Sequence, residues 1–548
     1  MTGDAEAMEL APAAARPLPV MSPRTRTGLC VLAAAVSLGV AADVLLRPMP
    51  WGLNLALWML EVCGATLAVE RWSGTERAAA GWMPGAIAVS LLMAWRDSPT
   101  LKALDVFALL AVLCLAAFRA QGGPVVLAGV GDYLLSLVAG AGYAIAGAVP
   151  VLGYDVKWGE IPRGGWSGRA AAVVRGLLFA APLLLVFGAL LAAADAAFEG
   201  LLTGLPGIRM DVVIGHVVMA GVFAWLSSGF LRALFVSGSA VAKAKAAPAP
   251  GFRMGVVEAG IVLGTLNALF LAFVVVQMRW FFGGAGVVAS QPGLGYAEYA
   301  RRGFFELVTV AALVLPLLLG VHWLLRGDGR GERAFRWLAG VQLGLLSVIM
   351  ASAMWRMWMY QAAYGLTELR LYTTAFMLWL AVVFGWFAAT VLRGRRDRFV
   401  FGALVSGAVT LGALHLASPD AVIVAVNANR PDAEQRFDGA YASSLSGDAV
   451  PGVLRALPRL NADERCLAAK SLLKQWAPSA RTDWRAWSWG SWRARGAIAR
   501  HQPELRAACT PEIEQRLRDR QQAERERRTA PIPLPQSETA DEHAAGAE

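Results

Sequence analysis

The chain has 548 residues, of which 57% are hydrophobic and only 16% are charged. Soluble domains carry roughly 25% charged residues, so this composition excludes an ordinary soluble protein and indicates a polytopic membrane protein. The formal net charge of +10 does not predict a nucleic-acid partner. Much of the positive charge lies in short loops between apolar runs, where membrane orientation and anionic lipid explain it.

The first 26 residues predict a disordered cytoplasmic leader (1–26) rather than a cleavable signal. They are acidic, then rich in Ala and Pro, and then basic. The apolar stretch Gly28–Leu46 that follows is too long for the core of a signal peptide. We therefore expect a transmembrane helical domain over residues 27–416 that begins with a retained span.

Apolar runs bounded by charges predict about eleven membrane spans, within a range of ten to twelve. A helix needs about 20 apolar residues to cross a bilayer. The runs lie at about 28–46, 52–69, 78–95, 103–118, 171–194, 212–235, 255–278, 304–325, 335–354, 371–392 and 398–416. Residues 122–150 are ambiguous, because Asp132 and scattered glycines interrupt an otherwise apolar stretch.

The unequal charge of the loops predicts an orientation. The loops after the spans ending near 235, 325 and 392, together with the span ends that flank them, hold 12 Lys and Arg, whereas the intervening loops hold 6. The positive-inside rule places the first set and the N-terminus in the cytoplasm. This holds only if 122–150 crosses the membrane an even number of times, as a re-entrant or interfacial segment or as two short passes. We favour no net crossing, which makes everything after about residue 417 extracytoplasmic.

The C-terminal region differs in composition from the rest. Residues 417–510 predict a small, mostly helical extracytoplasmic domain, and 511–548 a charged helix followed by a disordered tail. Four tryptophans alternate with arginines in one stretch of this region. Such a composition suits an anchor at the lipid headgroups, a packed core or a ligand-binding surface. The tryptophans are Trp484, Trp487, Trp489 and Trp492.

Five cysteines fall into two groups. Cys30, Cys63 and Cys114 lie in apolar spans, where thiols are usually inert. Cys466 and Cys509 lie in the region predicted to be extracytoplasmic, where an oxidising compartment permits a disulfide. Pairing requires Cα atoms within about 7 Å, so the sequence leaves this bridge open.

Polar side chains interrupt one long apolar run. Glu258, Asn267 and Gln277 all lie within residues 255–278. Glu258 and Asn267 are nine positions apart and point to opposite faces of a helix, so they do not form a single site. Intramembrane carboxylates are often functional. Glu258 therefore fits an ion or proton role, or a side chain that reaches from the cytoplasmic end of the helix to water.

Several long motifs carry a resemblance to a known family. They are WRDSPTLKALD at 95–105, FGALLAAADAAF at 187–198, VVEAGIVLGTLNALFLAFVVVQMRWFFGG at 256–284, YAEYARRGFFEL at 296–307, AYGLTELRLY at 363–372, the segment from Pro419 to Arg430, and LSGDAVP at 445–451. The chain resembles a family of bacterial integral membrane proteins known only as a domain of unknown function (the 4153/4173 group). The resemblance implies many transmembrane helices with a carboxy-terminal soluble region, and it implies no activity.

The predicted orientation places most of the polar motif residues on the outer face. Opposite charges near a membrane boundary are tolerated mainly when they pair. Such pairs would hold helices together, or the residues would line an outward cavity that binds a ligand, a lipid headgroup or a peptide. Catalysis is the third reading. The residues of this candidate ligand site are Asp195, Glu298, Arg301, Arg302, Glu306, Arg356, Tyr364, Glu368, Arg370, Asn427 and Arg430.

Short catalytic and metal-binding motifs give no support for an enzyme. The GWSG at 165–168 matches the serine motif of rhomboid proteases, but the nearest histidine in sequence, His216, lies inside a span. The histidines show no metal-binding spacing and there is no C-x-x-C, so we predict no metal, no cofactor and no catalytic residue. On an apolar helix, His216 is more often a buried hydrogen-bonding residue than a ligand.

The sequence thus predicts an all-α, polytopic transmembrane helix bundle of the bacterial cytoplasmic (inner) membrane. We expect a structural, sensory or assembly component with an outward-facing polar site. The alternatives are a secondary transporter or a protein that handles lipids or small molecules, and after these a membrane-embedded transferase. Expected partners are membrane lipid and another membrane or envelope protein, without nucleic acid, and the sequence predicts no particular oligomeric state.

Overall fold

The computed structural model describes residues 21–74, 80–161, 210–236, 253–282, 304–325, 329–430, 437–476 and 483–529, with isolated positions between 172 and 195. Regular structure in these residues is helical, apart from one isolated bridge between Met254 and Leu325. The chain divides into two compact units. Unit 1 comprises Met1–Pro419 and Arg481–Ser491, and unit 2 comprises Asp420–Ala480 and Trp492–Glu548.

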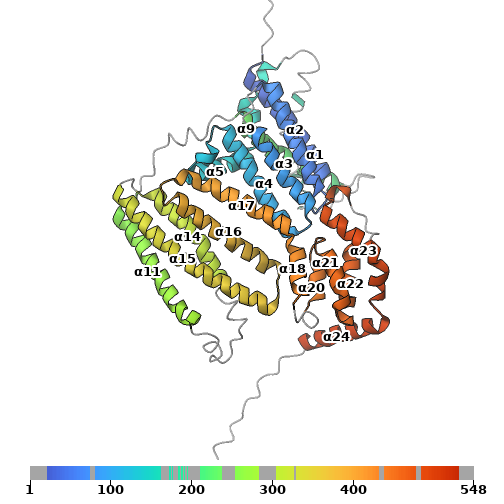
Figure 1. Cartoon of the computed structure of the whole chain (residues 1–548). Helices are drawn as coiled ribbons and strands as arrows, with labels where there is room; N and C mark the ends of the chain where they lie inside the picture. The colour runs from blue at the N-terminus through green and yellow to red at the C-terminus, as the bar shows by residue number, and fades with distance from the viewer. Residues whose placement is uncertain are drawn as a thin grey trace, which may run out of the picture. The chain divides into compact units, whose positions relative to one another are not determined.

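Nine helices in the described part of unit 1 are long and apolar enough to span a membrane. They are α1 (Pro23–Leu46), α2 (Leu53–Ser73), α4 (Pro99–Ala120), α9 (Met210–Phe235), α11 (Val256–Phe282), α14 (Phe304–Leu324), α15 (Gly329–Tyr364), α16 (Glu368–Thr390) and α17 (Phe399–Ala417). The prediction of an all-α, polytopic membrane protein is confirmed. Figure 1 shows α14, α15, α16 and α17 side by side in one half of the unit.

Two predicted spans differ from this set. The run at 78–95 forms the shorter helix α3 (Met83–Trp95), with Pro84 in its first turn, a position where proline costs no hydrogen bond. The run at 171–194 lies mostly outside the described residues. One bent pair of helices would make a tenth span if it is a broken span rather than a re-entrant loop.

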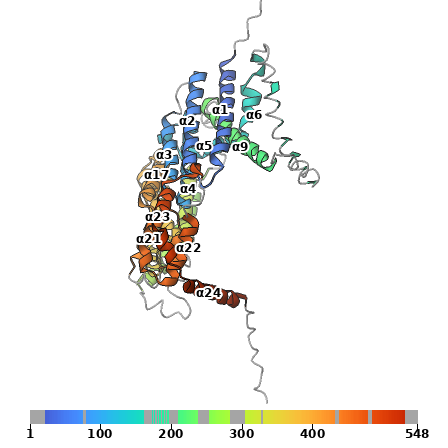
Figure 2. The same ribbon diagram turned by 90° about the vertical axis from the view of Figure 1, so that its right-hand side faces the viewer.

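Helices α1 and α9 pack against each other (Figure 2). They run in opposite directions, because the start of α1 and the end of α9 share a partner. At one end, Asp155 pairs with Arg24 at the start of α1 and with Arg232 near the end of α9. At the other end, Asp43 near the end of α1 bonds His216 near the start of α9. We call the first of these the Arg24 end of unit 1.

The opposite end, which we call the Asp97 end, holds the loop between α3 and α4 and the turn between α15 and α16. Two contacts bring this loop and turn together. The Ser98 hydroxyl lies 3.3 Å from the Tyr372 hydroxyl, and the Thr100 hydroxyl donates to Glu368 Oε1 at 3.4 Å. Because α16 begins here and α17 runs back from the far side, the turn between α16 and α17 lies at the Arg24 end.

The ambiguous segment is a sharply bent pair of helices. Helix α5 (Val130–Ala146) and the stretch Ala148–Asp155 meet at an angle of 66°. Gly147 makes the bend with φ of 49°, and its Cα faces the Trp225 ring, so a side chain would be both strained and blocked. The segment leaves α4 at the Arg24 end and returns there, where Asp155 meets Arg24.

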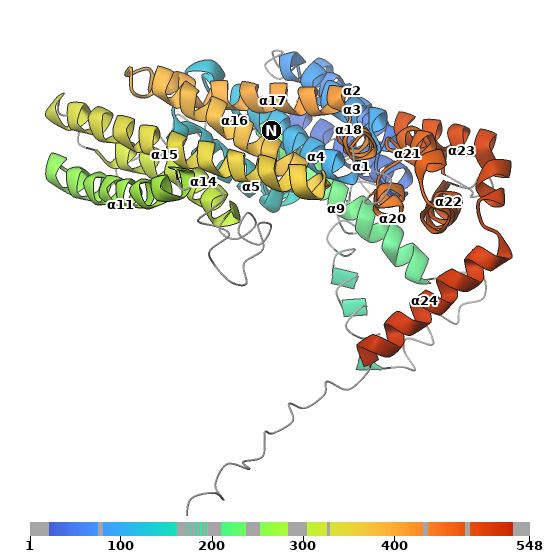
Figure 3. The ribbon, with the colours of Figure 1, turned by 60° about the horizontal axis from the view of Figure 1, so that its bottom comes forward.

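The described residues of unit 1 form two large apolar cores, with a smaller cluster around Phe118 and Tyr133. One large core is built by α1, α2, α3, α4 and α9, and the other by α11, α14, α15, α16 and the start of α17. Figure 3 shows α11 lying along α15. Small residues allow the tightest approach: a methyl group at Gly39 of α1 would overlap the Ala220 carbonyl oxygen of α9, a close contact typical of membrane helices.

Unit 2 is a small helical domain. It contains α18 (Pro419–Ala428) from Asp420 onward, α20 (Gly439–Ser444), α21 (Val450–Ala456), α22 (Ala462–Trp476), α23 (Trp489–Ala507) from Trp492 onward, and α24 (Pro511–Thr529). Cys466 of α22 and Cys509, just after α23, form a disulfide with Cα atoms 4.8 Å apart. The bridge joins α22 to the turn between α23 and α24.

Candidate functional site

The loop between α3 and α4 carries an unusual number of buried polar side chains. Its sequence is the WRDSPTLKALD motif, and Pro99 begins α4 directly after Ser98. Arg96, Ser98, Lys102 and Asp105 are all less than 9% exposed. Burying such groups is costly unless they are hydrogen-bonded or paired, so the network that satisfies them is the natural candidate for a site.

The Asp97 carboxylate joins this loop to a segment from far along the chain. Its Oδ1 accepts a hydrogen bond from the Lys102 ammonium at 3.3 Å and another from the Ser488 hydroxyl at 3.0 Å. The Ser488 side chain is fully buried and also bonds the Ser491 hydroxyl at 2.9 Å. The segment Arg481–Ser491, although it follows most of unit 2 in sequence, is therefore held within unit 1 by a charge-assisted contact.

The turn between α1 and α2 also contacts the segment Arg481–Ser491. The Trp487 carbonyl oxygen accepts a hydrogen bond from the Leu53 amide at 2.9 Å. A Cβ at Gly52 would overlap that oxygen, so only glycine permits this approach. Arg485 donates to the Val44 carbonyl. It also bonds the neighbouring Asp483 side chain, which lowers the pKa of that carboxyl below its usual value.

A fully buried histidine–carboxylate pair lies beside this network. His415 of α17 places Nε2 at 3.2 Å from Asp105 Oδ2 of α4, and neither side chain is exposed. His415 Nδ1 lies 2.9 Å from the Leu411 carbonyl, which can only accept a hydrogen bond, so Nδ1 carries a proton. The contact between Nε2 and Oδ2 then needs one more proton, which the two groups share.

The His415 backbone is fixed as well. The Arg96 guanidinium donates from Nε to the His415 carbonyl at 2.7 Å and lies 4.6 Å from the centre of the Trp95 ring. The Asp97 end therefore contains three buried ionisable side chains, those of Arg96, Asp105 and His415. Each of them bonds a residue of another element. In the described residues no three His, Cys, Asp or Glu side chains lie close enough together to hold a metal ion.

Comparison with known proteins identifies the family. The family described as "Domain of unknown function (DUF4153)" matches residues 83–456 of the chain, which is more than half of its length. The chain belongs to the DUF4153 family. No curated protein matches the chain, and no solved structure matches it.

The predicted site residues of this DUF4153 chain divide into those that join the network and those that do not. Glu368 joins it by accepting the bond from Thr100. Arg370 donates to the Tyr364 and Gly365 carbonyls at 3.2 and 2.5 Å and lies 4.0 Å from the Tyr360 ring centre. These residues fix the turn between α15 and α16.

A second predicted group assembles between α11 and α15. Gln277 Oε1 accepts hydrogen bonds from the Ser352 hydroxyl at 2.6 Å and from Arg356 Nη2 at 3.2 Å. Asn267, two to three turns away, donates to the Leu338 carbonyl at 2.9 Å. Both amides are buried, as expected of polar groups that bridge membrane helices.

The remaining predicted residues are scattered. Glu258, Asp195 and Glu306 are exposed in the described structure. Glu298, Arg301 and Arg302 lie outside the described residues, so the pairing of Glu306 with these arginines stays a prediction. Asn427 and Arg430 belong to unit 2. All four tryptophans of the stretch 484–492 keep exposed indoles, which disfavours the core-packing role.

The sequence reading missed two carboxylates that organise unit 1. Asp43 accepts from Arg47 one turn later and lies 2.5 Å from His216, a histidine that is half-exposed rather than buried. The i, i+4 spacing of Asp43 and Arg47 in an apolar run was a usable signal. Asp155 had no such signal, because its arginine partners lie 131 and 77 positions away.

Proposed function

We propose that this DUF4153 protein is a structural or sensory component of the bacterial cytoplasmic membrane whose outward-facing end fastens its own C-terminal segment. One observation carries the proposal: the nearly buried Asp97 carboxylate lies between the Lys102 ammonium and the Ser488 hydroxyl. A buried carboxylate is stable only while its partners stay in place, so the Asp97 end and the segment Arg481–Ser491 hold each other in one arrangement.

The distribution of basic loops supports the orientation. The Arg24 end carries the start of α1, the end of α9 and the arginine-rich turn between α16 and α17. The positive-inside rule assigns such an end to the cytoplasm. The bent segment 130–155 begins and ends there, which is the geometry that a segment without net crossing requires. The Asp97 end is then extracytoplasmic.

The hydrogen bonds at the Asp97 end favour a role in holding the segment Arg481–Ser491 over a role in catalysis. The Asp97 carboxylate accepts from Lys102 and Ser488, the Arg96 guanidinium donates to the His415 carbonyl, and Arg96 and Ser488 are buried. A catalytic group must reach a substrate within hydrogen-bond distance. A sensory role fits the same contacts, because release of Ser488 would remove one hydrogen bond from the Asp97 carboxylate.

A double-mutant cycle on Asp97 and Ser488 tests the proposal. We expect Asp97→Asn and Ser488→Ala each to destabilise the detergent-solubilised protein, with a coupling energy of about 1 kcal/mol because they remove the same contact. Trypsin should also cut near Arg485 faster in both variants. Ser90→Ala is the matched control, since Ser90 is equally buried but bonds only its own helix. Additive effects together with unchanged cleavage would refute the fastening role.

A complementation assay separates fastening from ligand binding. In a deletion strain, Ser488→Ala should restore function in proportion to how much folded protein it leaves, if the contact is structural. A variant that keeps wild-type stability and cleavage but abolishes the phenotype would instead favour the alternative of an outward ligand site.

A further inference from the structure

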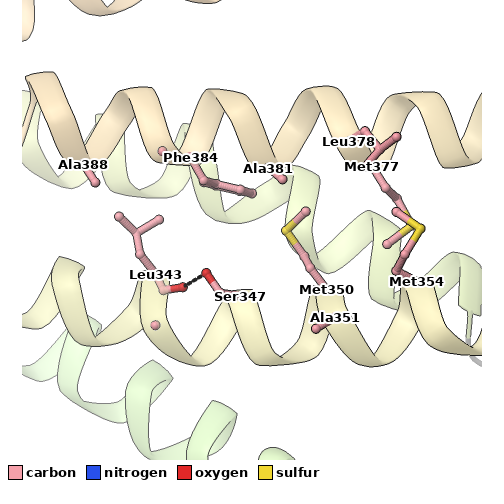
Figure 4. Close-up of a pocket in the computed structure, with 12 residues that line it drawn as sticks. Leu343, Ser347, Met350, Ala351, Met354, Met377, Leu378, Ala381, Phe384 and Ala388 are labelled. Carbon is pink, nitrogen blue, oxygen red and sulfur yellow. Dashed lines mark hydrogen bonds between the residues drawn. The ribbon is translucent and has the colours of Figure 1, made fainter.

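An apolar groove of about 440 Å³ runs along the surface between α15 and α16 (Figure 4). Its floor consists of the buried side chains Leu343, Met350, Met377 and Phe384. Its rims are small and exposed: Gly344, Ser347, Ala351, Ala381 and Gly385. The volume falls within the range of about 300–1,000 Å³ usual for ligand pockets. The groove lies in the middle of two membrane-spanning helices.

The lining selects an apolar occupant. Ser347, which carries the only hydroxyl among the described lining residues, donates to the Leu343 carbonyl of its own helix at 2.8 Å. The methionines on α15 and α16 have flexible thioether side chains that adapt to irregular shapes. From Leu343 to Met354 the groove extends along α15 for about 17 Å. That length is close to half of the roughly 30 Å hydrocarbon core, which is the depth of one lipid leaflet.

The positively charged guanidinium of Arg370 lies beyond the part of the groove that is nearer to the Asp97 end of unit 1. Arg370 precedes Met377 by seven positions on α16, so the two share a face and lie about 10 Å apart along the axis. The exposed Trp355 and Trp358 stack on each other on the adjacent part of α15. Exposed tryptophans mark the headgroup level of a membrane, so Arg370 lies at the depth of lipid phosphates.

We propose that this groove binds an anionic phospholipid of the surrounding bilayer, with one acyl chain along the floor and the phosphate at Arg370. The guanidinium has five N–H donors, and its hydrogen bonds to the Tyr364 and Gly365 carbonyls use Nη1. Guanidinium groups bind phosphate oxygens through paired hydrogen bonds. The lipid site does not depend on the fastening role of Asp97.

A second copy of the chain is the competing occupant, because small residues also line contacts between membrane helices. The positive charge of Arg370 favours a lipid over a second copy of the chain. A helix in the groove would place its own backbone or side chains against Arg370, whereas a lipid brings a phosphate to that depth without further cost. The apolar floor and the cation at one end match the two parts of a phospholipid.

Photolabelling tests the site directly. The full-length protein is placed in vesicles of phosphatidylcholine with a minor share of phosphatidylglycerol whose acyl chain carries a diazirine, and labelled residues are mapped by mass spectrometry. We expect the label to concentrate on the groove residues of α15 and α16. Arg370→Gln should lower this labelling several-fold, and Arg333→Gln, which removes another carbonyl-bound arginine from the opposite end of α15, should not.

Filling the groove provides the second arm. A methyl group added at Gly344 or Gly385 meets no described atom within 4 Å, and the same is true of Gly412 on α17. Gly344→Leu and Gly385→Leu should therefore fold and lose the label, whereas Gly412→Leu keeps it. Label spread evenly over all spanning helices of the wild-type protein would overturn the proposal. Efficient cross-linking of Ala351→Cys between two copies would also overturn it, in favour of a dimer.

Discussion

His415 Nε2 and Asp105 Oδ2 lie 3.2 Å apart, on helices α17 and α4 whose contacting residues are 310 positions apart in sequence. Both side chains are fully buried, and Asp105 Oδ1 has no hydrogen-bond partner among the described residues. The two side chains depend on each other, because removal of the imidazole leaves neither oxygen of the buried carboxyl group with a hydrogen-bond partner among the described residues.

Substitutions at this pair should therefore be strongly unequal. His415→Leu should cost about 3–5 kcal/mol of unfolding free energy, the usual loss when one partner of a buried pair is removed. Asp105→Asn should cost about 1 kcal/mol, because the amide still donates to Nε2. Denaturant unfolding in mild detergent measures both. The double variant should be more stable than the sum of the single losses predicts, and strict additivity would contradict the pairing.

Asp155 should matter more than either of its arginines. It is fully buried between Arg24 and Arg232, whose side chains are 59% and 15% exposed. Asp155→Asn should cost about 3–5 kcal/mol, because it removes the negative charge beside the largely buried Arg232. Arg24→Gln should cost no more than about 1 kcal/mol, as exposed ion pairs do. An equal loss for both variants, measured by thermal unfolding, would count against this ranking.

Glu160 gives a pH dependence outside the membrane spans. Hydrogen bonds from the Ser22 hydroxyl and amide lower the pKa of Glu160 from 4.5 to about 2. The unfolded chain therefore takes up this proton first, so the stabilisation is complete above pH 4.5 and is lost as the pH falls toward 2. The melting temperature of wild type should approach that of Glu160→Gln across this interval. Parallel pH profiles for the two proteins would refute the assignment.

The bridge between Cys466 and Cys509 is directly measurable. Denatured, non-reduced protein should take up alkylating reagent at Cys30, Cys63 and Cys114, and reduction should expose two further thiols. Replacing both bridge cysteines by serine should destabilise unit 2 by about 2–4 kcal/mol. Five thiols available without reductant would show that the bridge does not form and would weaken the extracytoplasmic placement.

The helical class follows from the sequence because apolar length is a local property. Helix limits are less predictable: α15 extends from Gly329 to Tyr364, beyond the predicted run 335–354, since charged and aromatic residues at both ends continue the helix. The network at the Asp97 end could not be predicted in this way. Ser488 meets Asp97 across 391 positions, and no local pattern encodes a contact of that range.

The candidate residues illustrate the same limit. The sequence analysis assigned Glu368 and Arg370 to the candidate ligand site and offered opposite charges as their partners. In the structure they lie beside the turn between α15 and α16, where Glu368 accepts from the Thr100 hydroxyl and Arg370 donates to backbone carbonyls. Ion-pair reasoning considers only charged side chains as partners. Hydrogen bonds to carbonyl and hydroxyl groups of neighbouring helices can be recognised only when the packing of those helices is known.

The orientation of the Asp97 end is the claim on which the functional account depends most. A reporter that is active only outside the cytoplasm, fused after Ala417 at the end of α17, measures it directly, with a fusion after Arg396 at the start of that helix as its partner. We predict activity after Ala417 and none after Arg396. The opposite pattern would place the fastened segment in the cytoplasm and contradict the account.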